Sequence, residues 1–181
     1  MAKYLKEILI HRDEISTMCH RLGARISADY ADREVILICV LKGAYVFMAD
    51  LARCLTIPCR IDFMSVSSYG SGTRSSGVVR ITKDLDLDIT GKHIMIVEDI
   101  VDSGLTLNHL RQLLATRKPA SIAVCAAFDK PDRRKIQVEV EYIGMKIPDE
   151  FIVGYGLDFD GKYRNLPDVF ILGDDSQGGN K

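Results

Sequence analysis

The alternation of apolar and polar positions divides the chain into short strands and amphipathic helices. Apolar residues recur at helical spacing from Ile15 to Tyr30, which predicts a first helix with Asp13 as its cap. Almost unbroken apolar runs at 35–40 and 93–98 are typical of parallel strands that are buried on both faces. Helical spacing returns after the second run and predicts a helix over 105–117.

The rest of the chain continues this alternation of strands and helices. A turn at 41–44 precedes a second predicted helix that ends near residue 52. Further strands are expected at 57–66, 78–83, 121–128 and 138–145, the first two of them as a hairpin. This order predicts an α/β fold with an open, mostly parallel sheet flanked by helices on both faces.

The pattern predicts one domain over residues 1–172. Residues 147–166 are rich in Gly, Asp and aromatic residues, so we expect them to form, with the N-terminal segment, a small cap beside the ligand site. Residues 173–181 are polar and glycine-rich and are predicted to be disordered.

Composition excludes several classes of protein. With 181 residues and 47% hydrophobic content, the chain can bury a sizeable core. A net charge of −1 argues against nucleic acid or an anionic membrane as the main partner, and no apolar run is long enough to span a bilayer. The five cysteines never form Cys-x-x-Cys and are interpreted as reduced thiols of a cytoplasmic protein. The four histidines show no metal-ligand spacing.

The strongest chemical pattern lies between the strand at 93–98 and the helix that follows it. Glu98 and Asp99 end the strand, where adjacent carboxylates suit sugar hydroxyls or a divalent cation. Asp102 then leads into Ser-Gly-Leu-Thr at 103–106, whose backbone N–H groups and hydroxyls suit a phosphate. Together these groups indicate a phosphorylated pentose. The alternative, a solvated acidic turn with a capped helix, requires fewer acids than the loop contains.

This stretch resembles the phosphoribosyl-pyrophosphate motif of type I phosphoribosyltransferases. Four further motifs occur in the expected order at 41–44, 67–70, 128–131 and 147–158. Over about 35–172 the chain is therefore similar to the hypoxanthine (hypoxanthine-guanine) phosphoribosyltransferases of the short bacterial kind. The resemblance implies a purine salvage enzyme that uses Mg²⁺. Such an enzyme moves the 5-phosphoribosyl group of phosphoribosyl pyrophosphate to N9 of hypoxanthine or guanine, giving IMP or GMP and pyrophosphate.

The resemblance also implies a role for individual residues. Asp102 would be the general base for the purine proton. The ribose and 5′-phosphate would be bound by Glu98, Asp99, Asp102, Ser103, Gly104, Leu105 and Thr106. The pyrophosphate would be bound by Lys42, Gly43 and Arg164, with a Leu41-Lys42 peptide that can be cis. The purine would be bound by Lys130, Phe151, Ile152 and Asp158. Mg²⁺ would be held by Glu98, Asp99 and Asp158. A mobile lid would contain Ser68 and Tyr69.

Two of these assignments have alternatives in the sequence itself. Lys130 would otherwise be a solvated charge in a basic loop. As a donor to the purine 6-oxo group, it would reject adenine, whose 6-amino group leaves that donor unpaired. The amino-acid sequence around Arg164 differs among relatives, so the resemblance supports the role of Arg164 less strongly than that of Asp102.

Other functions of the same fold remain open. A xanthine-preferring enzyme, or one that uses adenine, uracil or orotate, would share the phosphate loop. A regulator that senses phosphoribosyl pyrophosphate and binds DNA or RNA would need a basic face or an added domain, and the chain has neither. The resemblance further implies a homodimer or homotetramer.

Overall fold

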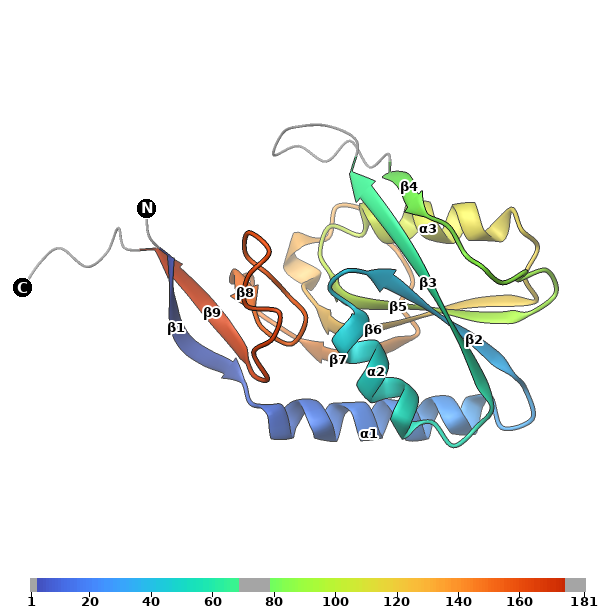
Figure 1. Cartoon of the computed structure of the whole chain (residues 1–181), viewed down its shortest axis with the longest axis horizontal. Helices are drawn as coiled ribbons and strands as arrows, with labels where there is room; N and C mark the ends of the chain where they lie inside the picture. The colour runs from blue at the N-terminus through green and yellow to red at the C-terminus, as the bar shows by residue number, and fades with distance from the viewer. Residues whose placement is uncertain (1–2, 69–78, 175–181) are drawn as a thin grey trace, which may run out of the picture.

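The computed structural model describes residues 3–68 and 79–174, which form two sheets. The larger, six-stranded sheet has the order β4-β3-β2-β5-β6-β7, and the smaller, three-stranded sheet has the order β1-β9-β8. Figure 1 shows the small sheet beside one end of the large one, with the loop around β8 between them. This arrangement leaves the ends of the central strands facing the small sheet.

The large sheet is mostly parallel, as the sequence predicted. Its parallel strands are β2 (Val35–Leu41), β3 (Cys59–Ser68), β5 (His93–Val101), β6 (Ser121–Asp129) and β7 (Tyr142–Lys146). The exception is β4 (Val79–Lys83), which pairs antiparallel with β3 and confirms the expected hairpin.

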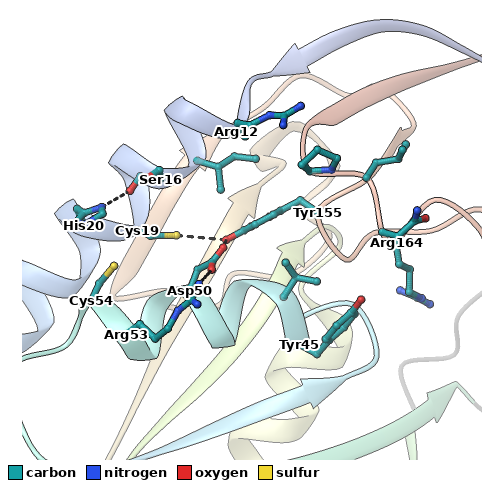
Figure 2. Close-up of a pocket in the computed structure, with 15 residues that line it drawn as sticks. Arg12, Ser16, Cys19, His20, Tyr45, Asp50, Arg53, Cys54, Tyr155 and Arg164 are labelled. Atoms are coloured by element: carbon teal, nitrogen blue, oxygen red, sulfur yellow. Dashed lines mark hydrogen bonds and ion pairs between the residues drawn. The ribbon is translucent and has the colours of Figure 1, made fainter.

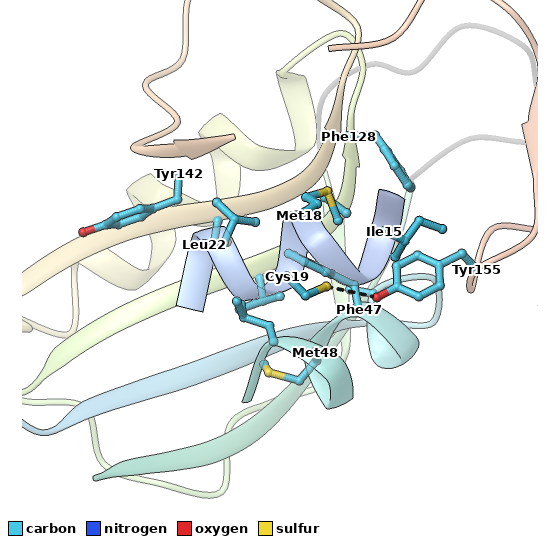
Figure 3. Packing of buried hydrophobic residues seen from close by; sticks show 14 of the residues in the cluster. Ile15, Met18, Cys19, Leu22, Phe47, Met48, Phe128, Tyr142 and Tyr155 are labelled. Atoms are coloured by element: carbon cyan, nitrogen blue, oxygen red, sulfur yellow. Dashed lines mark hydrogen bonds between the residues drawn. The ribbon is translucent and has the colours of Figure 1, made fainter. Parts of the chain in front are cut away.

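Helices cover both faces of the large sheet. On one face α1 (Arg12–Asp29) and α2 (Tyr45–Cys54) bury Met18, Leu22 and Phe47 in one apolar cluster (Figure 3). On the other face α3 (Leu105–Ala115) buries Leu107 and Leu110 in a second cluster. Alternate residues of the central strands enter the two clusters, which explains why those strands are apolar throughout.

The small sheet contains three strands, none of which the sequence pattern predicted. β1 (Lys3–Ile10) pairs antiparallel with β9 (Val169–Asp174), which also pairs with β8 (Ile152–Val153). Residues 4–8 of β1 are exposed, so the strand lacks the apolar alternation that signals a half-buried strand. The small sheet thus joins the N-terminal segment to the C-terminal strand. β9 extends two residues past the predicted boundary at 172, and residues 175–181 of the expected tail lie outside the described residues.

Two local predictions were wrong. The strand expected over 138–145 begins only at Tyr142, because the carboxylate of Glu141 accepts the Val124 N–H at 2.7 Å and replaces a backbone partner there. Asp13 does not cap α1. The helix begins at Arg12, and the Glu14 carboxylate accepts the preceding His11 N–H at 2.9 Å. A short 3₁₀ helix at Pro131–Arg133 occupies the basic loop.

None of the described helices combines the length and the apolar character that a membrane span requires.

Candidate active site

Two acidic side chains lie at the carboxyl end of the central strand β5. Glu98 is 8% exposed, and burial together with the neighbouring Asp99 raises its pKa well above the usual range. Burial also raises the pKa of Asp99, to about 6, and the charge of Asp158 acts in the same direction. Backbone N–H groups, including that of Ile100 at 2.7 Å, and the charge of Arg164 oppose this shift. Carboxylates whose ionised forms are disfavoured by burial are suited to a ligand that brings a cation or hydroxyl groups.

A glycine turn joins these acids to helix α3. Gly104 has φ of +81°, a left-handed conformation that disfavours other residues. A Cβ at Gly104 would lie 3.0 Å from a side-chain carbon of Val138, so the turn also packs closely against the segment before β7. Beside the turn is a cavity of about 100 Å³, whose lining includes Glu98, Ser103, Gly104 and Thr106. The N-terminus of α3 therefore opens on a small cavity, as the predicted phosphate site requires.

A hydrogen bond to its backbone carbonyl holds Asp102 in place, while one of its carboxylate oxygens accepts no hydrogen bond from the described residues. The Asp102 carbonyl accepts Arg134 Nη1 at 3.1 Å, and Arg134 also pairs with the buried Asp129. Arg133 Nε lies 3.1 Å from Asp102 Oδ1 without hydrogen-bond geometry. Within the described residues, this buried oxygen has no hydrogen-bond donor. Such an atom is costly unless a ligand supplies the partner.

Lys130 is not a solvated charge. It follows β6 and is only 7% exposed, and its ammonium donates to the Glu150 carbonyl. Burial lowers its pKa, while the charges of Asp102 and Asp149 oppose that shift. A buried ammonium close to Asp102 is available to recognise a ligand acceptor at this end of the site.

The aromatic side chain expected to stack on a base is accessible. Phe151 is 53% exposed, and its ring meets Phe159 edge-to-face at 5.8 Å. The next residue, Ile152, is buried in β8 and pairs with Ile171. The exposed ring of Phe151 and the buried Lys130 thus come from adjoining segments, because Lys130 donates to the residue before Phe151.

The loop after β2 meets the acid pair directly. The Leu41-Lys42 peptide is cis, Lys42 is exposed and Gly43 is buried. A Cβ at Gly43 would lie 1.5 Å from Asp99 Oδ2, so a side chain at this position would require the carboxylate or the loop to move. The predicted pyrophosphate loop and the predicted ribose acids are therefore neighbours.

Arg164 and Asp158 form an ion pair in the segment between β8 and β9. Arg164 Nη2 lies 2.5 Å from Asp158 Oδ1, and Arg164 Nη1 donates to the Gly156 carbonyl at 2.6 Å. The other oxygen of Asp158 accepts the Gly161 N–H at 2.8 Å. Both oxygens of Asp158 are thus in use, and among the described residues no three His, Cys, Asp or Glu side chains form a metal cluster. The role of Asp158 toward metal or purine stays a prediction.

Some site residues were not predicted from the sequence. Arg133 and Arg134 contact Asp102, and Asp129 pairs with Arg134, although the sequence indicated only a basic loop at 130–135. Nothing in the spacing shows which of several basic residues turns toward an acid. Of the predicted lid, Ser68 ends β3 and Tyr69 lies outside the described residues.

The fold and the site define a class of protein. A buried parallel strand that ends in two acids, followed by a glycine turn and a helix N-terminus, is an arrangement of α/β proteins that bind phosphorylated sugars. A family model described as "Phosphoribosyl transferase domain" matches residues 7–160.

Individual relatives define the branch of the family. The chain is 48% identical to the hypoxanthine phosphoribosyltransferase of Salmonella typhimurium, over 92% of this chain and 95% of that protein. It is 49% identical to the hypoxanthine-guanine phosphoribosyltransferase of Mycobacterium avium, over 93% and 86%. A crystal structure of the hypoxanthine-guanine phosphoribosyltransferase of Bacillus anthracis superposes with a TM-score of 0.90 at 42% identity, covering 96% of this chain and 100% of that one. The chain belongs to the hypoxanthine (hypoxanthine-guanine) phosphoribosyltransferase family, whose members are transferases of purine salvage.

Proposed function

We propose that the protein transfers the 5-phosphoribosyl group of phosphoribosyl pyrophosphate to N9 of hypoxanthine or guanine, giving IMP or GMP and pyrophosphate. The observation that carries the proposal is the position of Asp102. Asp102 lines the phosphate cavity, its charge acts on the buried ammonium of Lys130, and its Oδ1 accepts no hydrogen bond within the described residues. A purine at Lys130 and a 5′-phosphate at residues 102–106 would both be bound next to this carboxylate.

The difficulty of the reaction is electrostatic. The transition state has a ribosyl cation and a departing polyanion, so negative charge must be held near the ribose and positive charge near the pyrophosphate. Glu98 and Asp99, near the end of β5, supply the first when a bound cation favours the ionised forms that burial alone disfavours. Arg164 and the backbone around Lys42 and Gly43 supply the second.

Asp102 acts on the proton of the purine imidazole nitrogen. As N9 attacks the ribose carbon, the nitrogen that carries the proton becomes acidic, and a carboxylate in hydrogen-bond reach accepts it. The bonds from Arg134 to the Asp102 carbonyl and to Asp129 fix the backbone from which this side chain projects.

Selection of the base depends on Lys130 and its neighbours. An ammonium donates hydrogen bonds and accepts none, so it favours a 6-oxo group over a 6-amino group. The ammonium uses one of its three N–H donors on the Glu150 carbonyl, which leaves donors for the base. Phe151 offers an exposed ring for stacking, and the Ile152 backbone lies beside it.

Glu98 and Asp99 fit a magnesium ion that is completed by substrate oxygens. Mg²⁺ is commonly held by one or two carboxylates together with substrate phosphates and water, so the lack of a larger cluster in the described residues agrees with it. When bound, Mg²⁺ neutralises charge on the pyrophosphate and orients the ribose hydroxyls. For Asp158 to bind a second magnesium ion, its carboxylate would have to leave the ion pair with Arg164.

We further propose a cytoplasmic homodimer or homotetramer in which residues 1–172 act as one domain. The cytoplasmic location is supported by the cysteines, all five of which are described and form no disulfide. Burial raises the pKa of Cys19 to about 11 and of Cys39 to about 12, which argues against a catalytic thiol. Ser68 and Tyr69 are proposed to belong to a lid that excludes water from the ribosyl cation.

The test is product formation. Purified protein with phosphoribosyl pyrophosphate, Mg²⁺ and hypoxanthine should form IMP and pyrophosphate in equal amounts, and excess EDTA should abolish both. Uracil and orotate should give little or no nucleotide. A preference for one of these bases would replace the proposed substrate and retain the phosphoribosyl transfer.

A further inference from the structure

A buried tyrosine connects helix α2 to the segment that faces the pyrophosphate loop. Tyr155 is 4% exposed, and its hydroxyl donates to Asp50 Oδ2 of α2 at 2.8 Å. Cys19 Sγ of α1 lies 3.4 Å from the same hydroxyl, and Phe128 packs edge-to-face on the ring at 6.4 Å. Figure 2 shows the hydroxyl pointing between the two helices, at the wall of a cavity of about 570 Å³.

The hydroxyl is a fixed donor. Burial raises the pKa of Tyr155 above its usual range, so the proton stays on the oxygen at physiological pH. Asp50 is in turn paired with Arg53. The ring is therefore held on α2 at its far end, while its backbone belongs to the segment between β8 and β9.

The backbone of Tyr155 has little freedom. Its φ is +49°, and it lies between Gly154 and Gly156, whose φ values are +97° and +93°. The Tyr155 N–H donates to the Leu166 carbonyl at 2.8 Å, and the Gly156 N–H donates to the Arg164 carbonyl at 3.0 Å. The ring of Tyr155, anchored on α2, thus fixes a narrow loop. Arg164 lies on the opposite side of this loop.

Gly156, the residue after Tyr155, contacts the pyrophosphate loop. A Cβ at Gly156 would lie 2.1 Å from the carbonyl oxygen of Gly43, so the two backbones are in close contact. Gly43 in turn lies against Asp99. The anchor of Tyr155 therefore has a direct path to Gly43 and, through the hydrogen bonds of Gly156, to Arg164.

We propose that Tyr155 and Asp50 are positioning residues for pyrophosphate. They act through Gly156 on Gly43 and on Arg164, and they do not touch the substrate themselves. The inference rests on the proposed function, because Gly43 and Arg164 are pyrophosphate ligands only under it. It predicts that the hydroxyl of Tyr155 matters for phosphoribosyl pyrophosphate and not for the nucleotide product, whose phosphate binds at residues 102–106.

A second tyrosine provides a matched control. Tyr142 is 5% exposed and its hydroxyl donates to Asp29 Oδ2 of α1, also at 2.8 Å. Asp29 and Cys19 are ten residues apart on α1, roughly 15 Å along the helix. Figure 3 shows Tyr142 and Tyr155 at opposite ends of the packed cluster. Removal of either hydroxyl costs one buried tyrosine–aspartate bond, but only one of them adjoins the pyrophosphate loop.

The experiment compares Tyr155→Phe with Tyr142→Phe in the full chain. Both should lower the urea midpoint by similar amounts. Only Tyr155→Phe should weaken phosphoribosyl pyrophosphate, by about tenfold in Kd and in KM, and its Kd for IMP should stay within about twofold of the parent's. Asp50→Asn, which keeps an acceptor for the hydroxyl, should bind phosphoribosyl pyrophosphate better than Asp50→Ala.

The outcomes separate the inference from the proposed function. Parent-like binding of phosphoribosyl pyrophosphate by Tyr155→Phe would overturn the inference, and so would an equal loss in Tyr142→Phe or an equal loss of IMP affinity. A parent protein that binds phosphoribosyl pyrophosphate and forms IMP retains the proposed function in each of these cases. A parent that does neither overturns both.

Discussion

The Cα of Gly43 lies so close to the Asp99 carboxylate that a Cβ there would be 1.5 Å from Asp99 Oδ2. The loop after β2 and the end of β5 therefore share one small volume, although the two residues are far apart in the chain. Any side chain on Gly43 must displace either the loop or the carboxylate, and both are proposed ligands of the substrate.

Gly43→Ala should abolish most of the activity while the protein still folds. A displacement of about 1 Å at a reacting centre can reduce the rate by about 10²-fold, and we expect a loss of at least that size in kcat/KM for phosphoribosyl pyrophosphate. The control is Gly91→Ala: its added Cβ meets no heavy atom within 4 Å, so this substitution brings only the backbone strain of alanine at a φ of +67°, away from the site. Steady-state kinetics of both variants decide the matter, and a Gly43→Ala enzyme as active as Gly91→Ala would contradict the account.

Asp102→Asn should separate chemistry from binding. The asparagine keeps the size and reach of the side chain but cannot take the purine proton, so we expect single-turnover formation of IMP to slow by about 10²-fold or more. Affinity for hypoxanthine should change far less. Single-turnover measurement is needed because product release can limit kcat in the parent. If the variant matches the parent in that measurement, the proton passes to another group.

Lys130→Met should weaken the binding of the base selectively. A charged hydrogen bond to the 6-oxo group is worth about 1.5–3 kcal/mol, so we expect KM for hypoxanthine to rise by about 10–100-fold. KM for phosphoribosyl pyrophosphate should remain near that of the parent. Lys135→Met in the same loop is the control, because Lys135 is exposed. Equal kinetic effects of the two substitutions would show that Lys130 acts only as a surface charge.

The ligand-free protein should lose stability as pH rises. The folded-state pKa of Asp99 is about 6, above its ordinary value of 3.8, and that of Glu98 is raised in the same direction, with burial as the main cause for both. The folded state therefore binds more protons than the unfolded state between these values, and the free energy of unfolding decreases as pH rises from about 4 through 6. Without ligand and Mg²⁺, Glu98→Gln should raise the urea midpoint at pH 7.5.

For Asp84, an acid at the surface, we expect the opposite effect of neutralisation on stability. The ion pair and hydrogen bond with Arg117 lower the pKa of Asp84, so this carboxylate favours the folded state above its ordinary pKa. Asp84→Asn should therefore leave the urea midpoint at pH 7.5 unchanged or lower it. If Glu98→Gln also lowers the midpoint, the acid pair is stabilised in the empty site and the electrostatic part of the account is wrong.

The large sheet could be predicted because its strands are buried on both faces. The apolar run of β2 places alternate residues in the two clusters on either side of the sheet, and α3 follows β5 with its own apolar stripe. The small sheet could not be predicted in this way. β1 is mostly exposed, and its partner strand begins at Val169, so neither local pattern nor a nearby turn indicates the pairing.

The site residues also differ in how far the sequence could predict them. The acids, the glycine turn and the helix start are consecutive in the chain, so the phosphate loop is visible in the sequence. Contacts between distant segments are not, including Gly43 with Asp99 and Tyr155 with Asp50. The burial of Lys130 also could not be read from its basic neighbours, because it depends on the Glu150 carbonyl twenty residues later. The resemblance to a known family supplied the role of Lys130 where the local pattern favoured a solvated charge.

The central claim is that this site transfers a phosphoribosyl group to a 6-oxopurine. The most direct measurement is the ratio of kcat/KM for hypoxanthine to kcat/KM for adenine, with saturating phosphoribosyl pyrophosphate and Mg²⁺ and with nucleotide identified by mass. A buried donor that is left unpaired by the wrong base discriminates by about 10⁴-fold, so we predict a ratio of at least about 10³. A ratio near one would contradict the account.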